Sequence, residues 1–380
     1  MINRKNILIG IFILFISMSF TFFNVGHFLF NMLKPSEKGN MARNESTGNT
    51  YTSAVKYNHL SRTINGKKQE MDILEVDVSK PGIKIQPVLS FNLIYGFENL
   101  SSMAGKKKAY AAINGGFFYE YGQPSGMVAI NGKLITGSSG KYPVFTVENG
   151  KAALMEIKSK LWLEYGSGKL KIDKMNTPGK IGEVVVYTPA YGLSNRAKTT
   201  NLTVTIKDNI IIDMGIYSGE VGIPDNGMLI TIFSEQNYYL DTLPLKKGDT
   251  VKQVHEPDLT GDVSAYECGS WIIRDGRVVL GDRDAWVGVL TNRDPRTAIG
   301  IKNDGKVVLF TVDGRQPGYS EGLTGRELGE FLLEYGVKNA AMLDGGASTE
   351  MIVNNKIVNR PSFRGQERPL GGGILVMWEK

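Results

Sequence analysis

The sequence predicts an α+β protein: a β-rich, mixed, twisted sheet with a few helices and many hairpins, preceded by one N-terminal transmembrane helix. The chain has 380 residues and 45 glycines, many of them in Asn-Gly or Asp-Gly pairs between alternating apolar and polar runs. Such pairs are typical of tight hairpin turns. One later stretch has helical periodicity, and the stretch at the front of the chain is long and apolar.

The front of the chain has the composition of a membrane anchor. A positively charged flank precedes a nearly unbroken apolar run over 7–23, and about 20 apolar residues in a helix span a bilayer. A cleaved signal peptide is the alternative, but no small-residue cleavage site precedes Ala42. We therefore predict a cytoplasmic flank and signal-anchor helix at 1–33. Because the positive flank stays inside, the C-terminal domain is expected outside the cytoplasm of a single-pass cell-membrane protein.

The rest of the chain divides into a linker and one folded domain. Residues 34–58 are polar and rich in Ser, Thr, Asn and Gly, which is typical of a flexible stalk. Residues 59–380 are expected to form the domain. Its first half alternates apolar and polar residues, with turns predicted at 131–132 and 275–276.

The last third has the clearest pattern. Residues 297–315 predict a hairpin that turns at Asp304-Gly305. Residues 324–336 predict a helix, because Thr324 and Glu327 fit a capping box and apolar residues recur at helical spacing. A buried strand over 337–343 then ends at an aspartate.

The order strand, helix, strand places two aspartates together. If both strands belong to one sheet, the connection is long enough for a crossover and the strands are parallel. Asp313 and Asp344 would then stand at the same edge, where open α/β sheets bind ligands. The competing interpretation is two plain Asp-Gly turns, but no partner strand resumes directly after either one.

Residues around these aspartates suit an anionic ligand. Asn114, Gly115 and Gly116 repeat the pattern of a polar residue and glycine at a strand end. The backbone of Gly345 and Gly346 can form an anion-binding nest, and nearby donors could add to it. Those donors are the hydroxyls of Ser348 and Thr349 and the guanidinium groups of Arg296 and Arg315. For a lone arginine, a surface ion pair is the simpler interpretation.

Composition narrows the chemistry. One cysteine and three histidines argue against a disulfide framework, a zinc site and a Ser-His-Asp triad, so acid–base work would fall on carboxylates. Asp344, Asp313 and Glu327 are the catalytic candidates, although Glu327 has the alternative role of a helix cap. No cofactor is expected to be required, and a shared Ca²⁺ or Mg²⁺ stays open with its ligands unknown. Net charge is +6 without a basic stripe, which argues against a nucleic-acid partner.

Several segments, in order, resemble the phosphodiester glycosidase family, which includes the mammalian uncovering enzyme and bacterial proteins labelled as exopolysaccharide biosynthesis proteins. These segments are "AAINGGFF", "RTAIGI", "FTVDGR", "GLTGRELGEFLLEYGVKNAAMLDGGAST" and "NRPSFRGQERPLGGGILV". The resemblance covers about residues 60–378. The matched positions include the residues named above together with Thr297 and Thr324.

The resemblance implies a hydrolase that cleaves a sugar-1-phosphodiester at its glycosidic bond, with a phosphorylated glycan of cell wall, capsule or exopolysaccharide as the expected substrate. Two departures from the family pattern, at 267–270 and at Ala347 in place of a third glycine, suggest altered substrate choice or reduced activity. Two alternatives stay open: an anchored module that binds anionic glycan without turnover, and a phosphodiesterase that cleaves P–O rather than C–O.

Overall fold

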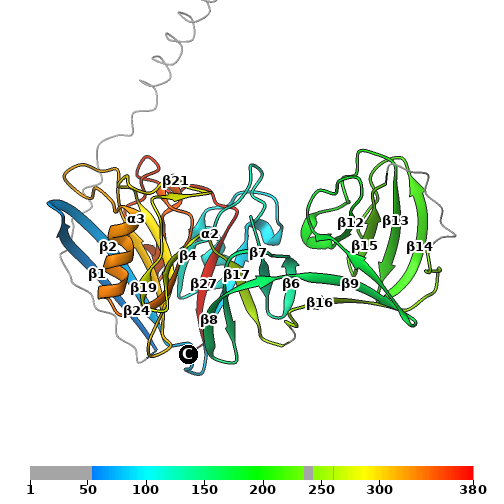
Figure 1. Cartoon of the computed structure of the whole chain (residues 1–380), viewed down its shortest axis with the longest axis horizontal. Helices are drawn as coiled ribbons and strands as arrows, with labels where there is room; N and C mark the ends of the chain where they lie inside the picture. Colours follow the sequence, from blue (N-terminus) through cyan, green and yellow to red (C-terminus); the bar gives the residue numbers. More distant parts are fainter. Residues whose placement is uncertain (1–53, 235–242, 260, 380) are drawn as a thin grey trace, which may run out of the picture. The chain divides into compact units, whose positions relative to one another are not determined.

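The computed structural model describes residues 54–234, 243–259 and 261–379, and within them the fold is dominated by β-strands (Figure 1). These residues form 27 strands in six sheets and two α-helices. The predicted α+β class, built on one mixed sheet, is therefore wrong. The described residues form a β protein with several sheets and only two α-helices. The short α2 (Leu100–Lys107) packs on β4 and β27, and α3 (Gly325–Glu334) packs on β18, β19 and β24.

Two sheets carry the strand ends that matter for function. In spatial order, the seven-stranded sheet consists of β1 (Val55–Ile64), β2 (Lys67–Val76), β23 (Val307–Val312), β22 (Arg296–Lys302), β24 (Val337–Met342), β18 (Trp271–Arg274) and β19 (Arg277–Val278). The β4 sheet consists of β26 (Lys356–Ile357), β25 (Met351–Val353), β4 (Ala111–Asn114), β27 (Gly372–Trp378) and β3 (Ile83–Leu89).

The other four sheets contain most of the middle of the chain. The first is β6 (Lys133–Thr136), β5 (Val128–Ile130), β17 (Ser264–Glu267), β7 (Ser139–Glu148) and β8 (Lys151–Lys158). The second is β11 (Lys174–Met175), β12 (Val184–Tyr187), β15 (Gly227–Ile232), β13 (Asn201–Lys207) and β14 (Ile210–Tyr217). The remaining two are β10 (Gly168–Ile172), β9 (Lys160–Tyr165) and β16 (Val251–Glu256), and β20 (Arg283–Asp284) with β21 (Gly288–Val289).

The hairpin and helix predicted in the last third are confirmed. β22 and β23 pair antiparallel through a turn at Asp304-Gly305, where Gly305 has a φ of 84° that favours glycine. In α3 the Thr324 hydroxyl accepts from the Glu327 amide, and the Glu327 carboxylate accepts from the Thr324 amide. This capping box starts the helix, and Gly336 follows its end with a φ of 88°.

The two strands that lead to the aspartates flank a common neighbour. β23 and β24 each pair antiparallel with β22, so they run parallel to one another in the same sheet. Val312 lies opposite Arg296, and Met342 lies opposite Ala298. Both carboxyl ends therefore reach the start of β22, as the sequence predicts.

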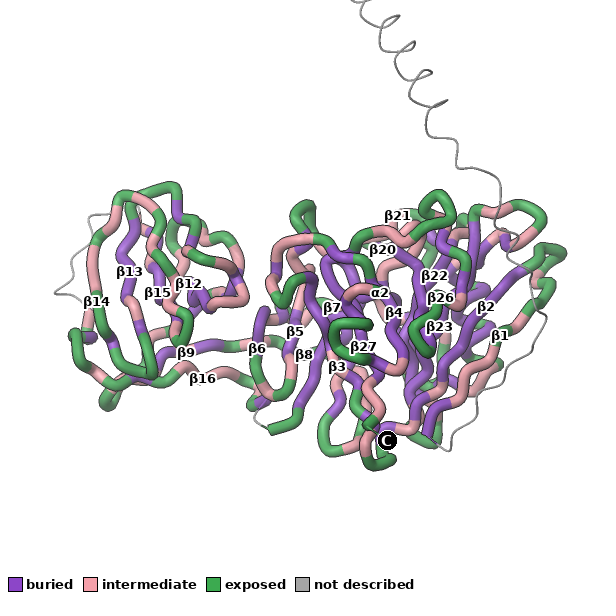
Figure 2. Tube along the Cα trace, turned by 180° about the vertical axis from the view of Figure 1, so that it is seen from behind, coloured by how far each residue is buried: buried purple, intermediate pink, exposed green. Residues whose placement is uncertain are grey.

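The seven-stranded sheet is buried on both faces in this region, and Figure 2 shows β22 and β23 as buried along their length. One face packs Phe310, Ala298 and Met342 against Phe331 of α3 and its neighbours. The opposite face packs residues such as Ile299 into a larger core that includes Ile113 and Ile374 of the β4 sheet. Because side chains alternate along a strand, Arg296 and Thr297 of β22 point to opposite faces.

The membrane prediction needs correction. Within the described residues, no helix is both long and apolar enough to cross a bilayer. The single-pass cell-membrane localisation and the membrane as a partner are therefore not carried further. The predicted signal-anchor helix at 1–33 and most of the predicted stalk at 34–58 lie outside the described residues. Val55–Asn58, which we assigned to the stalk, belong to β1 and pair with β2.

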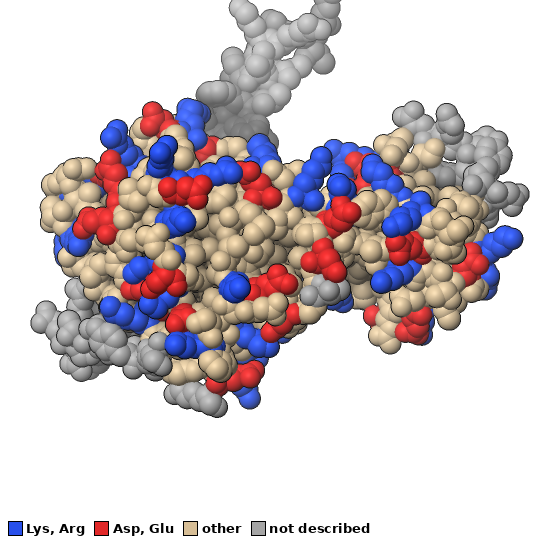
Figure 3. All heavy atoms as spheres, turned by 60° about the horizontal axis from the view of Figure 1, so that its bottom comes forward, with Lys and Arg blue, Asp and Glu red and all other residues tan. Residues whose placement is uncertain are grey.

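Charged side chains are mixed on the face that Figure 3 shows. Basic and acidic groups alternate there over short distances and form no continuous basic stripe. Among the described residues, several charged side chains of opposite sign are paired, as Lys160 is with Glu256 and Lys84 with Asp262. This face therefore offers no broad electrostatic surface of one sign.

Candidate active site

Asp313 and Asp344 stand at one edge of the seven-stranded sheet, directly after β23 and β24. Asp313 continues the pairing of β23, since its amide donates to the Glu70 carbonyl 2.9 Å away. Asp344 leaves the sheet, and its amide donates to the Gly115 carbonyl, 3.1 Å away, just after β4. The end of the β4 sheet therefore meets the same edge as the two aspartates.

A chain of hydrogen bonds joins the two aspartates through buried side chains. Asn114 donates to the Asp344 carbonyl at 2.6 Å and accepts from the Thr297 hydroxyl at 2.9 Å. The hydroxyl oxygens of Thr297 and Thr349 lie 3.2 Å apart. Asn359 closes the chain, since its amide nitrogen lies 3.1 Å from the Thr349 carbonyl and 3.0 Å from Asp313 Oδ1. Four polar side chains thus fix the relative position of the aspartates.

Asp313 is a buried carboxylate whose two oxygens are fully engaged. Besides Asn359 at Oδ1, the Arg360 amide donates to Oδ2 at 2.8 Å and the Tyr319 hydroxyl at 3.3 Å. Only 1% of Asp313 is exposed. Burial raises its pKa to about 6, against the hydrogen bonds from Asn359 and Arg360, which lower it. A group so enclosed is suited to holding its neighbours in place.

Asp344 is partly exposed and has fewer partners. Burial raises the pKa of its carboxyl, while a hydrogen bond with Ser348, the charge of Arg368 and the Gly345 amide act to lower it. Arg368 also donates to the Ser348 hydroxyl at 2.9 Å. A carboxyl group, a hydroxyl and a guanidinium therefore converge at the end of β24.

Arg315 supplies a second guanidinium at this edge. Its side chain is exposed, and Nε donates to Asp294 at 2.8 Å. Its terminal nitrogens lie against Gly346, because a Cβ added there would stand 3.1 Å from Arg315 Nη2. Asp294 thus orients Arg315 over the turn that follows Asp344. Two guanidinium groups flank this turn, a suitable arrangement for an anionic oxygen group.

Arg296 does not join them. It is 1% exposed, and its side chain donates to the carbonyls of Leu323 and Asn292 at 2.9 Å each. Burial lowers its pKa, in part against the attraction of Asp294. The structure therefore does not bring Arg296 to the turn at Asp344, because the alternation of β22 turns this side chain toward the opposite face of the sheet. Thr297, its neighbour, does face the site.

The predicted glycine nest is largely occupied by the protein itself. The Gly346 amide donates to the Pro295 carbonyl at 2.9 Å, and the Gly345 amide bonds to the Asp344 carboxyl. At Gly115 and Gly116, added Cβ atoms would meet the Tyr266 hydroxyl at 2.4 Å and the Glu267 carbonyl at 2.9 Å. Close packing accounts for these glycines without a ligand.

Ala347 does not crowd the turn. It lies in a short 3-10 turn, Gly346–Ser348, and the left-handed φ of 60° falls on Gly346 instead. The reduced activity suggested by this departure therefore has no backbone reason at Ala347.

Glu327 is likewise separated from the aspartates. One carboxylate oxygen accepts from the Thr324 amide, and the other accepts from Asn65 at 2.7 Å and from Arg293. These contacts lie at the start of α3, on the opposite face of the sheet from Asp313. Of its two sequence-based interpretations, helix capping is the one the structure shows, and we do not carry Glu327 forward as an acid.

Sequence reasoning missed several residues of this edge. Asn359, Arg360 and Arg368 all come from the segment after β26 and bond to Asp313 or to Ser348 beside Asp344. They lie in the final segment that carries the family resemblance, which could have pointed to them. Two carboxyl clusters, described next, were also missed, and no local pattern marks them.

The first cluster adjoins Asp313. Asp72 is 0% exposed and accepts from the Tyr57 hydroxyl at 2.6 Å. His59 bridges Asp72 and Glu70, with 2.9 Å from a ring nitrogen to each carboxylate. Hydrogen bonding to Asp72 raises the pKa of His59 to about 9, although burial opposes this. The cluster places a positive charge beside two acids behind Asp313.

The second cluster adjoins Asp344 through the chain. Glu350 is 1% exposed, and burial with the neighbouring Glu367 raises its pKa to about 9. Glu367 accepts from the Ser101 amide at 2.9 Å and hydroxyl at 2.6 Å. Although burial acts to raise it, the hydrogen bond from Glu350 lowers the pKa of Glu367. The opposite shifts favour a neutral Glu350 beside an ionised Glu367.

Metal binding gains no support from this geometry. Within 54–234, 243–259 and 261–379, no three His, Cys, Asp or Glu side chains gather as ligands of one ion. In particular, Asp313, Asp344 and Glu327 do not converge on a shared cation position.

The turn after Asp344 therefore combines a partly exposed carboxyl with a guanidinium group on either part of the turn, Arg368 at Ser348 and Arg315 at Gly346. Residues 200–377 match the model of the phosphodiester glycosidase family. The chain is 29% identical, over 167 residues, to human N-acetylglucosamine-1-phosphodiester alpha-N-acetylglucosaminidase, covering 40% of this chain and 28% of that protein. The resemblance seen in the sequence is thus confirmed: residues 200–377 match the phosphodiester glycosidase model, and a relative named as such a glycosidase aligns with part of the chain.

Two further similarities extend the comparison. The SPbeta prophage-derived protein YomE of Bacillus subtilis is 34% identical over 102 residues, which cover 27% of this chain and 16% of that protein. A crystal structure of a hypothetical protein from Synechocystis has a TM-score of 0.73 at 21% identity, covering 87% of this chain and 63% of that one. The latter shows a shared fold. The aligned segments span less than a third of the human and Bacillus relatives.

Proposed function

We propose that this protein hydrolyses the glycosidic bond of a sugar-1-phosphodiester. The observation that carries the proposal is that Arg368 and Arg315 both contact the turn that follows Asp344, at Ser348 and at Gly346. In this proposal the arginines supply positive charge for the phosphodiester, and the Asp344 carboxyl acts on the adjoining sugar. The match of residues 200–377 to the phosphodiester glycosidase model supports the same reaction.

In a sugar-1-phosphodiester the phosphate is a good leaving group. It departs as an anion, so the site must chiefly hold the phosphate and stabilise positive charge on the sugar. Arg368 and Arg315 hold phosphate oxygens, a task suited to the planar guanidinium. Asp344 attacks the anomeric carbon, or activates the water that does so.

Asp313 has a different task in this proposal. Its oxygens are fixed by Asn359, Arg360 and Tyr319, so it is a positioning residue that acts through them. Asn359 transmits that position to Thr349, one residue from Ser348. Asp313 therefore helps to fix the position of the Ser348 hydroxyl beside Asp344.

The substrate proposed is a glycan that carries such a phosphodiester, in cell wall, capsule or exopolysaccharide. The name of the human relative specifies N-acetylglucosamine-1-phosphodiester. An aryl phosphodiester of N-acetylglucosamine-1-phosphate is accordingly the first substrate to test.

The test compares the full chain with Asp344→Asn. Loss of the charged carboxyl should reduce kcat/KM by about a thousandfold or more, the scale expected when a transition-state interaction is removed. Asp304→Asn is the matched control, since Asp304 lies in an exposed turn where it pairs with Lys306. Equal turnover by the wild type and Asp344→Asn would refute the role of Asp344.

The same assay separates the alternatives. Water labelled with ¹⁸O places the label on the sugar if C–O is cleaved and on the phosphate if P–O is cleaved. Glycan binding without any turnover would instead favour a non-catalytic module.

A further inference from the structure

The structure contains an aromatic-walled cavity beside the candidate active site that the proposed reaction does not use. The cavity measures about 270 Å³ and is lined by Tyr119, Ser125, Ser139, Lys141, Tyr142, Glu267, Ala285 and Trp286. We call it the aromatic pocket. Its volume is below the about 300–1,000 Å³ of pockets for drug-sized ligands, and it suits a single six-membered ring.

Trp286 is held rigidly at the wall of this pocket. Its amide donates to Asp284 Oδ1 at 2.7 Å, and Asp284 is itself bonded to the Ser270 hydroxyl. The indole stacks on Phe117, with ring centroids 5.4 Å apart and an angle of 8° between the planes. Tyr119 meets the indole edge-on at 5.6 Å. Such a fixed aromatic surface is ready to bind a ligand at small entropic cost.

Polar groups in the pocket suit a neutral, hydroxyl-rich ligand. Glu267 is 5% exposed and forms part of the lining, with its carboxylate held by the Met127 amide at 3.0 Å. Trp286 Nε1 is buried and has no hydrogen-bond partner among the described residues. An unsatisfied buried donor calls for an explanation, and a ligand hydroxyl would provide a partner. Aromatic faces with a few fixed polar groups are the usual composition of a small-molecule site.

A short stretch of backbone links the wall of the pocket to the turn at Asp344. The Gly115 carbonyl accepts from the Asp344 amide, and Phe117, which supports Trp286, lies two residues further along. Two residues span at most about 7 Å of extended chain. A larger cavity of about 470 Å³ shares Tyr119, Ser125 and Ser139 with the pocket and continues away from it.

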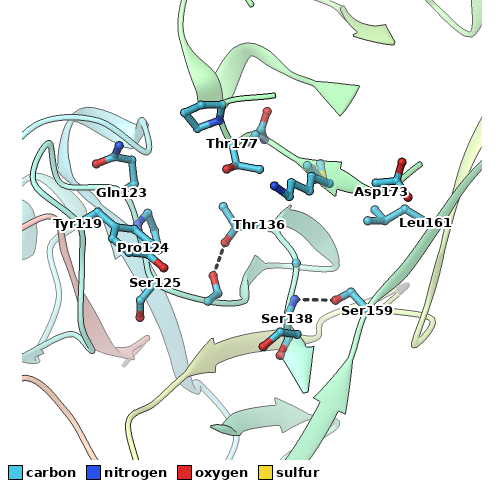
Figure 4. Close-up of a pocket in the computed structure, with 17 residues that line it drawn as sticks. Tyr119, Gln123, Pro124, Ser125, Thr136, Ser138, Ser159, Leu161, Asp173 and Thr177 are labelled. Atoms are coloured by element: carbon cyan, nitrogen blue, oxygen red, sulfur yellow. Dashed lines mark hydrogen bonds between the residues drawn. The ribbon is translucent and has the colours of Figure 1, made fainter. Parts of the chain in front are cut away.

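Figure 4 shows this larger cavity, with Tyr119, Gln123 and Ser125 on one side and Leu161 and Asp173 on the other. Hydroxyl groups are frequent on its walls, among them those of Thr136, Ser138 and Ser159. Thr136 and Ser159 are already bonded, to the Gly126 carbonyl and the Ser138 amide. The two cavities share three lining residues, so together they offer an extended polar surface next to the aromatic pocket.

We infer that the aromatic pocket binds a neutral pyranose unit of the glycan whose phosphodiester lies at Asp344. The inference rests on the proposed function for the identity of the neighbouring group. Trp286 and Tyr142 contact the apolar faces of the ring, and Glu267 accepts hydrogen bonds from its hydroxyls. The protein therefore selects an extended glycan over an isolated sugar phosphate.

Binding of neutral oligosaccharides tests this without any hydrolysis. The probes are hexasaccharides of β-1,4-linked N-acetylglucosamine and of α-1,4-linked glucose, with the two monosaccharides, titrated calorimetrically into the full chain. We expect at least one hexasaccharide to bind about tenfold more tightly than its monosaccharide. Trp286→Ala should weaken that binding about tenfold or more, as loss of a central aromatic contact does.

Trp162→Ala is the matched control. Trp162 lies on β9, where Lys169 covers its ring, and it lines neither cavity. If Trp286→Ala fails to fold, Tyr142→Ala replaces it, because Tyr142 contributes the other wall. Unchanged hexasaccharide binding in the pocket variant, or no hexasaccharide binding by the wild type, would overturn the inference.

The outcome is separable from that of the proposed function. Trp286-dependent binding in a protein that hydrolyses no sugar phosphodiester would leave the pocket standing and refute the reaction. Hydrolysis without pocket-dependent oligosaccharide binding would support the reaction and refute the pocket.

Discussion

Asp313 and Asp344 follow the two strands that flank β22 and share the same Asp-Gly signature, yet their surroundings differ. Asp313 is enclosed by Asn359, Arg360 and Tyr319, which use both of its carboxylate oxygens. Asp344 is partly exposed, with Arg368 close by. A matched motif thus yields one carboxylate that organises protein groups and one that is available to a substrate. Which is which depends on what packs against each strand end.

The largest effect that this difference between the aspartates predicts comes from removing the cation beside Asp344. Arg368→Ala should lower kcat/KM on the aryl phosphodiester by about 100-fold, because a charged hydrogen bond to phosphate is lost. Arg368→Lys should recover only part of this, since lysine cannot bind in a bidentate manner. Steady-state kinetics, with separate kcat and KM values, provide the measurement.

Arg326→Ala is the control for that experiment. Arg326 is an exposed arginine of α3 that pairs with Glu330, away from the site. If Arg326→Ala and Arg368→Ala lose activity equally, general charge rather than a local contact is responsible, and the assignment of Arg368 fails.

Asp313→Asn addresses the other half of the comparison. The amide would set an N–H group against the donors of Asn359 or Arg360, leaving a buried donor unpaired at a cost of about 1–3 kcal/mol in the free energy of unfolding. The folded-state pKa of Asp313 is raised to about 6. Its stabilising contribution is therefore present below its unfolded value of 3.8 and is lost as pH rises through about 6.

Urea unfolding of both proteins at about pH 4 and about pH 7 measures this effect. The stability difference between wild type and Asp313→Asn should be larger at the lower pH. Unaltered stability together with a loss of turnover as large as in Asp344→Asn would mean that Asp313 reacts directly, and the two aspartates would then be equivalent.

Local patterns account for what could be predicted of this region. The capping residues of α3 and the apolar strands before each aspartate are properties of short segments, and both proved correct. Arg296 was expected near the aspartates, but its side chain lies on the other face of the sheet. Which face of β22 it occupies depends on packing that the local sequence does not reveal. Glu327 fitted both a cap and a site, and only its contacts with Asn65 and Arg293 decide between them.

Long-range pairing explains the remaining errors. β9 pairs with β16, and Tyr165 lies opposite Val251, a partner that no local pattern indicates. Counting helices without knowing how strands divide among sheets led to the α+β class. Arg368 and Glu350 reach the site from separate turns, so only the family resemblance of the final segment could have marked the arginine.

A pH effect of a different kind concerns the acid pair Glu350 and Glu367, which follows the Asp344 turn. Glu350 holds a proton in the folded state up to about pH 9 because it is buried beside Glu367. An isolated glutamate loses its proton near 4.5, so folding takes up a proton between these values and stability falls as pH rises through about 9, by at most about 1.4 kcal/mol per pH unit. Glu350→Gln keeps the hydrogen-bond donor toward Glu367 without titrating.

Thermal unfolding of wild type and Glu350→Gln across alkaline pH would show whether the pair behaves in this way. The variant should retain more of its melting temperature above about pH 9 than the wild type does. Because the Glu350 amide bonds to Asn114, whose amide also holds the Asp344 carbonyl, alkaline loss of activity should follow the same difference. Parallel pH profiles for both proteins would show that Glu350 is already charged, and the turn that carries Asp344 would then be insensitive to this pair.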